Sequence, residues 1–170
     1  DVSAMNKILS LDEETLTVTV QPGVLLKDLI AYVEARGYLY APDPAEKNAS
    51  IGGNVSTNAG GMRAVKYGVT RNYVLALDLY KIDGTKVHLG ATTYKYATGL
   101  NLQQLVVGSE GSLGVITKIV LKLLPLPQFT LNAVIAYDSL ALGIKNVNAI
   151  FNAHLDPTAI EFVEKKVIAL

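Results

Sequence analysis

The 170-residue sequence predicts an α+β fold, in which a mixed or antiparallel sheet is flanked by helices. Three patterns support this class. Residues 15–20 alternate strictly between apolar and polar side chains, which is typical of a half-buried strand. Residues 25–36 repeat their apolar side chains at helical spacing and are followed by Gly37, a common helix stop. Residues 115–124 alternate again, as expected for a sheet strand with one exposed face.

Short apolar runs bounded by turn residues predict the other strands of this unit. Leu16, Val18 and Val20 share one face of the first clear strand, which we expect to lie on the core. Asp83-Gly84 predicts a type I′ hairpin, because this pair accepts the left-handed backbone that such turns need. The further strands are expected at residues 6–9, 38–40, 73–82 and 86–89.

The segment before the last strand is expected to be irregular over residues 90–99. A short helix then follows, capped by Asn101 or Thr98 and ended by Gly108. The last strand places Lys118 and Lys122 on its exposed face. Its core face is expected to carry Val115, Thr117, Ile119, Leu121 and Leu123.

Pro125 and Pro127 mark the best domain boundary, which divides the chain into residues 1–127 and 128–170. The second part predicts a strand at 131–137, a helix at about 139–153 and a strand at 159–163, in the order expected for the start of another domain. The chain begins abruptly, and residues 165–170 reach no stop signal. We therefore expect a piece of a longer protein.

Composition limits the classes of function. Half of the residues are apolar and 18% are charged, which predicts a folded chain, and 15 basic residues balance 15 acidic ones without forming a cluster, which argues against nucleic-acid binding. The absence of cysteine excludes disulfides, thiolate catalysis and cysteine-ligated metals, and fits a cytoplasmic setting. No signal peptide begins the sequence, and its most apolar run, residues 113–127, is too short and too charged to span a bilayer.

Residues 48–61 read NASIGGNVSTNAGG and contain little that fills a core. Glycine is costly in regular structure, so this density indicates either a flexible surface loop or backbone that a ligand approaches closely. Ser50 is a candidate N-cap for a short helix at 51–57. The free N–H groups at the start of that helix would favour a phosphate.

A second glycine segment favours the ligand interpretation. Residues 106–117 read VVGSEGSLGVIT, with Gly108, Gly111 and Gly114 at three-residue spacing before a strand. This spacing differs from the G-x-G-x-x-G of a Rossmann turn, and the sequence contains no Walker P-loop. We expect both segments to line one large ligand.

The chain resembles the flavin-binding region of the vanillyl-alcohol oxidase family, also called the p-cresol methylhydroxylase type, and within it the glycolate oxidase and D-lactate dehydrogenase branch. The resemblance covers residues 20–125 in seven ordered motifs. They are VQPGV at 20–24, APDP at 41–44, SIGGNVSTNAGG at 50–61, YG at 67–68, DG at 83–84, TGLNL at 98–102 and GSEGSLGVIT at 108–117. Leu100-Asn101 departs from the Tyr-Asp usual in this branch.

The resemblance implies an FAD-binding domain of two α+β subdomains, with the cofactor extended between them and its flavin facing a separate cap domain. The first subdomain would precede residue 1, so this chain would carry the second one and the start of the cap. Residues implied to line the pyrophosphate, ribityl chain and flavin are Pro42, Gly52, Gly53, Asn54, Thr57, Asn58, Gly60 and Gly61. Residues implied on the adenosine side are Glu110, Gly111, Gly114, Val115 and Ile116, with the main chain of the last two at the adenine.

The implied activity is hydride transfer from a 2-hydroxy acid, such as glycolate or D-lactate, to FAD. The electron acceptor stays open between oxygen, a quinone and a protein, and partner subunits or a homo-oligomer are compatible with the sequence. No His or Cys lies between Pro42 and Asn72, so we expect non-covalent FAD. The catalytic residues are unknown and expected outside this piece, which alone should be inactive and bind FAD weakly. The alternative is a noncatalytic nucleotide-binding or interaction subunit, and the location is cytoplasmic or peripheral at a membrane.

Other polar side chains have two interpretations each. His88 and His154 are candidates for a general base, but a surface or structurally hydrogen-bonded role is favoured, and two lone histidines make a poor metal site. Arg63 and Lys66 are candidates to meet a phosphate or a substrate carboxylate, or are solvated loop charges.

Glu110 is favoured as a ligand to a ribose over a partner for a lysine, because glycines surround it. Tyr67, Tyr94 and Tyr96 either touch the flavin or cover the core, and packing is favoured. Asp78 interrupts an apolar strand and is expected at a sheet edge or exposed.

Overall fold

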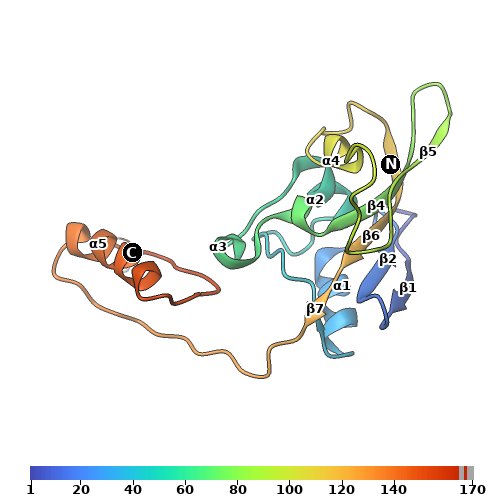
Figure 1. Ribbon diagram of the computed structural model, residues 1–170. Helices are drawn as coiled ribbons and strands as arrows, with labels where there is room; N and C mark the ends of the chain where they lie inside the picture. The colour runs from blue at the N-terminus through green and yellow to red at the C-terminus, as the bar shows by residue number, and fades with distance from the viewer. Residues whose placement is uncertain (165–166, 168–170) are drawn as a thin grey trace.

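A computed structural model describes residues 1–164 and 167, and Figure 1 shows their arrangement. Five strands form one sheet in the order β1-β2-β6-β4-β5, and all its pairings are antiparallel. A two-stranded ribbon pairs β3 (Tyr38–Leu39) with β7 (Leu124–Pro125). The sheet strands are β1 (Ile8–Asp12), β2 (Thr17–Val20), β4 (Val74–Tyr80), β5 (Lys86–Gly90) and β6 (Val115–Lys122). The predicted α+β class is confirmed.

Helices are short except at two places. α1 (Leu26–Glu34) buries Leu26, Leu29 and Val33, and the chain leaves it through Gly37, whose φ of +82° is the left-handed conformation expected there. α5 (Leu140–Asn152) is the longest helix among the described residues. The other helices are α2 (Ile51–Thr57), α3 (Ala64–Tyr67), the 3₁₀ helix η1 (Thr70–Asn72) and α4 (Gln103–Val106). None of the helices described is long and apolar enough to cross a membrane.

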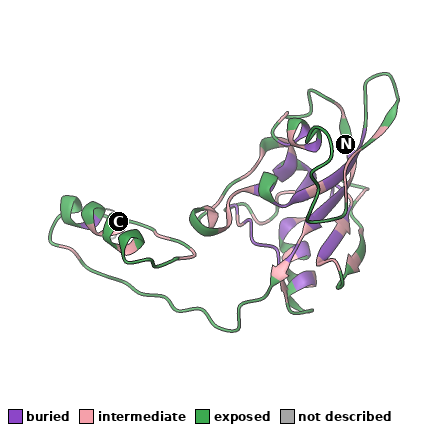
Figure 2. Cartoon of the chain, viewed as in Figure 1, coloured by how far each residue is buried: buried purple, intermediate pink, exposed green. Residues whose placement is uncertain are grey.

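The core lies on one face of the sheet. Side chains from its central strands pack there with the buried stripe of α1 and with α2, and Figure 2 shows this buried layer in purple. Residues in the layer with no exposed surface include Val18, Val20, Leu26, Leu29, Val55, Leu77, Ile119 and Leu121. Each Å² of apolar surface that is buried contributes about 25 cal/mol to the free energy of folding, so this apolar layer is the main source of stability.

Two strand predictions near the N-terminus need correction. Leu16 has a φ of +49°, so it belongs to the turn, and the strand begins at Thr17, two residues later than predicted. The preceding strand is Ile8–Asp12 and not residues 6–9. Asp12 Oδ1 accepts the N–H groups of Glu14 and Thr15, at 2.9 and 3.0 Å, and so holds the turn itself.

The predicted type I′ hairpin is wrong. Of its two residues only Gly84 has a positive φ, +80°, whereas that turn needs two. The N–H of Lys81 donates to the carbonyl of Thr85 at 3.0 Å, which closes a three-residue loop. Asp83 Oδ1 accepts the N–H of Thr85 at 2.9 Å, and this side-chain contact favours the longer loop.

The predicted alternation in β6 fails at its start. The β4–β6 register shifts between Asp78 and Leu79, opposite Thr117, and this irregularity reverses which side chains face the core. Ile116 is therefore buried at 7% exposure while Val115 is 54% exposed. Beyond the shift, Ile119 and Leu121 are buried as expected. The predicted N-caps of the short helix before β6, Asn101 and Thr98, are also wrong, because the N-cap of α4 is Leu102, which makes no side-chain hydrogen bond.

The chain after β7 leaves the sheet and forms a separate lobe around α5 (Figure 1). The predicted helix is confirmed, with Ser139 as its N-cap accepting the N–H of Leu142 at 3.3 Å. The predicted strands at 131–137 and 159–163 do not form. Leu131 and Val134 are 87% and 100% exposed, so these segments have no neighbouring strand among the described residues to pair with. Of the C-terminal residues 165–170, only Val167 is described.

Candidate cofactor-binding site

The first glycine segment forms the predicted capped helix. Ser50 adopts an extended backbone, and its Oγ accepts the N–H of Gly53 at 3.1 Å. Asn58 ends α2 in the left-handed conformation, with a φ of +51°. Asparagine accepts this conformation more readily than most residues. The prediction of an N-capped helix at residues 51–57 is confirmed.

The N–H groups that begin α2 are not free, which corrects one expectation. Ile51 donates to the carbonyl of Val24 and Gly52 to that of Pro22, both at 2.8 Å. With Gly53 bonded to Ser50, each of the first three donors already has a partner inside the chain. The start of α2 is thus fixed to the turn of the VQPGV motif and does not offer a phosphate site.

The two glycine segments lie against each other. The N–H of Gly108 donates to the carbonyl of Val55, and the N–H of Glu110 donates to the carbonyl of Ser56, both at 2.9 Å. These bonds join the last turn of α2 to the loop after α4, and Figure 1 shows the two helices side by side. We call this contact the glycine junction, formed by residues 55–58 and 107–111. The two segments are thus in contact, as the expectation that both line one ligand requires.

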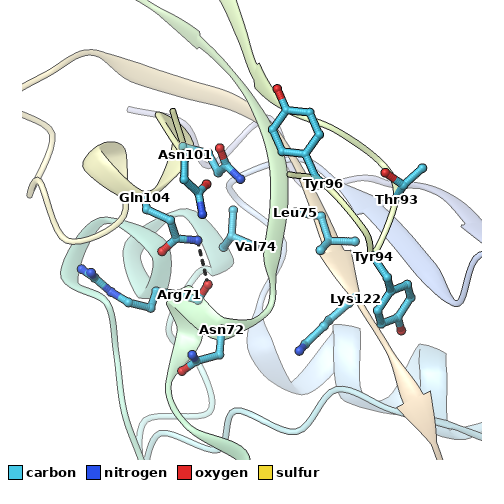
Figure 3. Close-up of a pocket in the computed structure, with 11 residues that line it drawn as sticks. Arg71, Asn72, Val74, Leu75, Thr93, Tyr94, Tyr96, Asn101, Gln104 and Lys122 are labelled. Atoms are coloured by element: carbon cyan, nitrogen blue, oxygen red, sulfur yellow. Dashed lines mark hydrogen bonds between the residues drawn. The ribbon is translucent and has the colours of Figure 1, made fainter. Parts of the chain in front are cut away.

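Arg71 connects the two segments of the glycine junction. Its N–H donates to Asn58 Oδ1 at 2.9 Å, and its Nη2 donates to the carbonyl of Val107 at 3.1 Å. Gln104 Nε2 in turn donates to the carbonyl of Arg71 at 3.0 Å (Figure 3). Sequence reasoning missed Arg71, because a single arginine in a polar stretch carries no periodic or motif signal.

The glycines of the first segment serve different purposes. A Cβ at Gly52 would lie 2.6 Å from Pro22 Cβ, and one at Gly61 would overlap the carbonyl group of Asp43, so these two positions are close contacts within the chain. Gly60 is limited only by Val69 Cγ1 at 3.1 Å. Gly53 is exposed, and a Cβ there would meet only Ser50 Oγ, at 3.1 Å. Its backbone is open to a ligand.

The second segment presents an open main chain. Glu110 and Gly111 are exposed and have φ values of +51° and +80°, and a Cβ at Gly111 would meet nothing within 4 Å. Gly114 is different, because a Cβ there would overlap Leu79 and the carbonyl of Tyr80. β2 pairs with β6 only as far as Ile119, so one edge of residues 115–118 has no paired strand among the residues that the structure describes.

The remaining predicted residues lie around the same junction. Pro42 is buried beside the Asp43 carbonyl that contacts Gly61, and Thr57 Oγ1 donates to the carbonyl of Gly53 at 3.0 Å. Asn54 is 4% exposed, and its Nδ2 has no acceptor in the described part of the chain. No hydrogen bond among the described residues uses the N–H groups of Gly60, Gly61 or Gly111. These free donors and the open glycines fit an anionic, extended nucleotide.

The basic residues beside the first segment are paired within the chain. Asp43 accepts Arg63 Nε at 3.4 Å and also binds Lys47. Lys66 Nζ lies 2.9 Å from Asp156 Oδ2 in the lobe of α5, and this contact raises the pKa of Lys66 through the Asp156 carboxylate. Arg63 and Lys66 therefore act as internal ion-pair partners in this structure.

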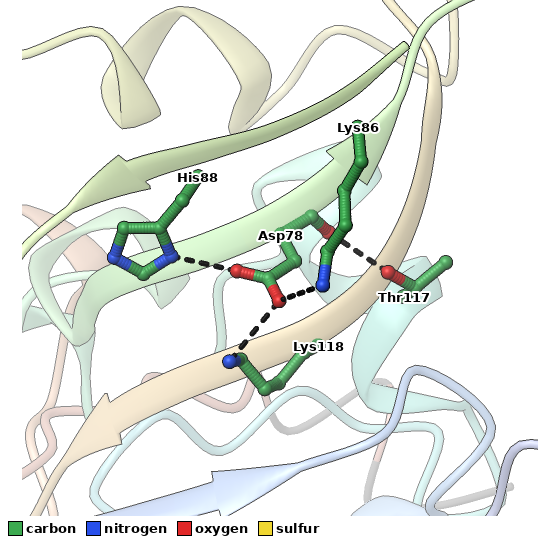
Figure 4. A network of polar contacts seen from close by, with 5 residues as sticks. All are labelled: Asp78, Lys86, His88, Thr117 and Lys118. Atoms are coloured by element: carbon green, nitrogen blue, oxygen red, sulfur yellow. Dashed lines mark hydrogen bonds and ion pairs between the residues drawn. The ribbon is translucent and has the colours of Figure 1, made fainter. Parts of the chain in front are cut away.

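Asp78 is the residue that sequence reasoning placed wrongly. It is 4% exposed in the middle of the sheet, on the face opposite the core, and three basic side chains surround it (Figure 4). His88 Nδ1 lies 2.6 Å from its Oδ1, and Lys86 and Lys118 lie 3.1 and 3.0 Å from its Oδ2. Burial alone raises the pKa of Asp78, but the hydrogen bonds from His88, Lys118 and Lys86 outweigh it and lower the pKa to about 2. The structural role favoured for His88 is confirmed.

The tyrosines divide between packing and a cavity. Tyr67 packs against the core, as predicted. Tyr94 and Tyr96 instead line a cavity on the other side of the sheet, with the Tyr94 hydroxyl donating to the carbonyl of Leu123 at 2.5 Å. No residue assigned to the cofactor lines this cavity.

Comparison with known proteins identifies relatives of this chain. The family described as FAD binding domain matches residues 1–90. The chain is 50% identical over 167 residues to a D-lactate dehydrogenase of Anaerostipes hadrus, covering 98% of this chain and 35% of that protein. It is 41% identical over 162 residues to the glycolate oxidase subunit GlcD of Bacillus subtilis, covering 95% and 34%.

Solved structures show the same fold. An alkyldihydroxyacetonephosphate synthase superposes with a TM-score of 0.79 at 24% identity, over 94% of this chain and 28% of that one. The chain thus spans about a third of the length of the relatives it matches. The match includes the lobe around α5, since the alignments cover nearly the whole chain.

Proposed function

The chain belongs to the FAD binding domain family, whose cofactor is FAD, and from this premise we propose that the protein containing it oxidises a 2-hydroxy acid by hydride transfer to FAD. The names of its relatives, D-lactate dehydrogenase and glycolate oxidase subunit, support a substrate of the glycolate or D-lactate class. Because the chain spans about a third of those proteins, the remainder of the protein supplies the catalytic residues and the electron-acceptor site.

The glycine junction is the observation that carries the proposal. Two segments about fifty residues apart are joined through Gly108 and Glu110, and both leave main chain open on one side. An extended nucleotide needs close approach to backbone at several points along its length, which side chains would obstruct. A flexible surface loop would not need its glycines fixed by hydrogen bonds to a distant segment.

We assign the cofactor contacts by position along this junction. The N–H groups of Gly60 and Gly61 would face the pyrophosphate, and the exposed backbone of Gly53 would allow the cofactor to approach α2. The open edge at Val115 and Ile116 would meet the adenine, and Glu110 would accept from the ribose. We call these residues the cofactor cradle, together with Pro42, Gly52, Asn54, Thr57, Asn58, Gly111 and Gly114.

FAD supplies the redox chemistry when bound, and the residues of this chain bind and orient it. Binding is non-covalent, since none of the assigned residues is a histidine or cysteine. Residues 1–127 form the second FAD subdomain, and residues 128–170 begin the substrate or cap domain. The protein acts in the cytoplasm or peripherally at a membrane, alone, with partner subunits or as a homo-oligomer.

The test uses the full-length protein. We expect flavin absorption bands at one FAD per chain, release of all flavin into the supernatant on denaturation, and bleaching of the bands by glycolate or D-lactate without oxygen. Gly53→Val should weaken FAD binding at least roughly tenfold, because its branched side chain fills the open approach to α2. Ala31→Val makes a similar change at an exposed position of α1, outside the cradle, and should leave affinity unchanged.

Three results would reject parts of this assignment. Unchanged FAD affinity in Gly53→Val would refute the placement of the cofactor on α2. Flavin that remains with the denatured chain would refute non-covalent binding. A full-length protein that binds no FAD, or that binds it without reacting with any 2-hydroxy acid, would favour the alternative, a noncatalytic nucleotide-binding or interaction subunit.

A further inference from the structure

The lobe around α5 is joined to the rest of the structure at few points. Between β7 and α5, residues 126–138 form neither a helix nor a strand, and residues 126–136 are exposed. Within the part of the chain that the structure describes, Lys66 of α3 is the only residue outside this linker whose hydrogen bonds or ion pairs reach the lobe. Figure 1 shows α3 on the side of the sheet-containing part that faces the lobe. One side chain therefore makes the polar contact between the two parts.

Lys66 contacts Asp156 at two atoms. Its Nζ lies 2.9 Å from Asp156 Oδ2 and donates to the carbonyl of the same residue at 3.4 Å. The hydrogen bond to Asp156 raises the pKa of Lys66, so the ammonium group stays charged. The same Nζ lies 5.6 Å from the centroid of the Tyr67 ring, which is within reach of a cation–π contact.

The backbone that carries Lys66 is anchored beside the first glycine segment. α3 begins after Met62 and Arg63, which follow Gly61, and the N–H of Tyr67 donates to the carbonyl of Arg63 at 2.9 Å. The Arg63 side chain pairs with Asp43, and Tyr67 packs against the core. Lys66 is thus held at a short, fixed distance along the chain from the cofactor cradle.

The backbone that carries Asp156 is fixed by the end of α5. His154 has a φ of +57°, and its N–H donates to the carbonyl of Phe151 at 2.9 Å. The N–H of Leu155 donates to the carbonyl of Ile150 at 3.3 Å. These two bonds around one left-handed residue form a Schellman motif, which ends the helix. Asp156 follows this motif directly, so its position depends on α5.

We propose that Lys66 and Asp156 form a latch that seats the α5 lobe on α3 and that opens when their ion pair breaks. Exposed ion pairs usually contribute little, because ordering two side chains offsets most of the attraction. Here the backbone on both sides is already fixed, which reduces that cost. The two side chains are 31% and 72% exposed, so dissolved salt screens the attraction and should open the latch.

The consequence for the cofactor rests on the function proposed above. α3 continues the loop of Gly60 and Gly61, whose N–H groups would face the pyrophosphate. A seated lobe limits the movement of this loop, so we expect FAD to leave more quickly when the latch is open. Lobe opening and FAD release are measured separately, which distinguishes a failure of the latch from a failure of the proposed function.

Hydrogen exchange, followed by mass spectrometry on the full-length protein, measures the latch without reference to flavin. Lys66→Met and Asp156→Asn should each raise the exchange rate of residues 64–68 roughly twofold to fivefold, the range set by an exposed ion pair. Exchange within α5 should not change, because the lobe keeps its fold. Lys66→Arg retains the charge and should exchange as the wild type does.

Matched variants and a charge exchange complete the test. Lys27→Met and Lys145→Met remove exposed lysines that have no ion pair among the described residues, and they should change nothing. Lys66→Asp combined with Asp156→Lys should restore wild-type exchange, and about 1 M NaCl should bring the wild type to the level of Lys66→Met. Wild-type exchange in both charge-removing variants, or no restoration by the exchanged pair, would overturn the latch.

The rate of FAD release, followed by the recovery of flavin fluorescence on dilution, tests the coupling to the cofactor. It should rise by the same factor as the exchange rate in Lys66→Met and Asp156→Asn. Faster exchange with unchanged FAD release would overturn this coupling. A full-length protein that binds no FAD would refute the proposed function, whereas its exchange rates would still decide whether the latch exists.

Discussion

Replacing Asp78 by asparagine tests the electrostatics of the sheet. The carboxylate is buried at 4% exposure, and its three basic partners, His88, Lys86 and Lys118, are each partly exposed to solvent. Asparagine has nearly the same shape and keeps one acceptor oxygen, so the change removes mainly the charge. The basic side chains can turn to water, which limits the penalty of leaving them unpaired.

The size of the effect follows from the pKa of Asp78, which falls from an ordinary value of 3.8 to about 2. At about 1.4 kcal/mol per tenfold change in proton affinity, the ionised group adds about 2 kcal/mol of stability. Because the folded pKa lies below the unfolded one, this stability is fully present above roughly pH 5 and is lost as the pH falls through 3.8 towards 2.

The assay is urea unfolding of the full-length wild type and of Asp78→Asn between pH 7 and pH 2, followed by circular dichroism. The difference in unfolding free energy should be constant near neutral pH and shrink by about 2 kcal/mol in the acid range. Glu14→Gln removes an exposed carboxylate with no ion pair among the described residues, and it should show no such dependence. A difference that is the same at pH 7 and pH 2 would refute the reasoning.

The remaining predictions concern the cradle. Arg71→Ala should raise the dissociation constant of FAD roughly tenfold in a fluorescence titration, because it loosens the glycine junction; unchanged affinity contradicts that role. Ser50→Ala removes the cap of α2 and should cost about 1 kcal/mol in urea unfolding, and no loss would count against the cap. Gly61→Ala forces a Cβ onto the carbonyl of Asp43 and should cost roughly 1–3 kcal/mol, whereas Gly53→Ala should not destabilise the protein. Equal melting temperatures for the two glycine variants would disprove this distinction.

Local sequence patterns predicted the elements whose partners lie within the chain. α1 and α5 follow from apolar spacing with a glycine stop or a serine cap, and α2 follows from Ser50 despite its two glycines. In each case a short segment contains both the sequence pattern that predicts the helix and most of the contacts that stabilise it. The contact between the glycine segments was also predictable, because the hypothesis that both line one ligand requires it.

Long-range contacts explain the errors. The free donors expected at the start of α2 bond to Pro22 and Val24, which lie almost thirty residues earlier. Asp78 looked misplaced in an apolar strand because its partners, Lys86 and Lys118, come from two other strands. Only the register of the sheet brings these three residues together.

The failed strands have a related cause. The apolar residues at 131–137 and 159–163 match strand patterns, but a strand needs a neighbour, and none is described for them. The irregularity opposite Thr117 likewise reverses the alternation of β6, and no residue type in the sequence indicates it. Such features depend on pairing geometry and not on composition.

The backbone bonds of the glycine junction also bear on how a nucleotide is taken up. Val55 and Ser56 hold Gly108 and Glu110 in position through backbone hydrogen bonds, and Arg71 adds bonds to Asn58 and to the carbonyl of Val107. Under the proposed function, the entropy of ordering these residues would be lost during folding and not when the cofactor binds.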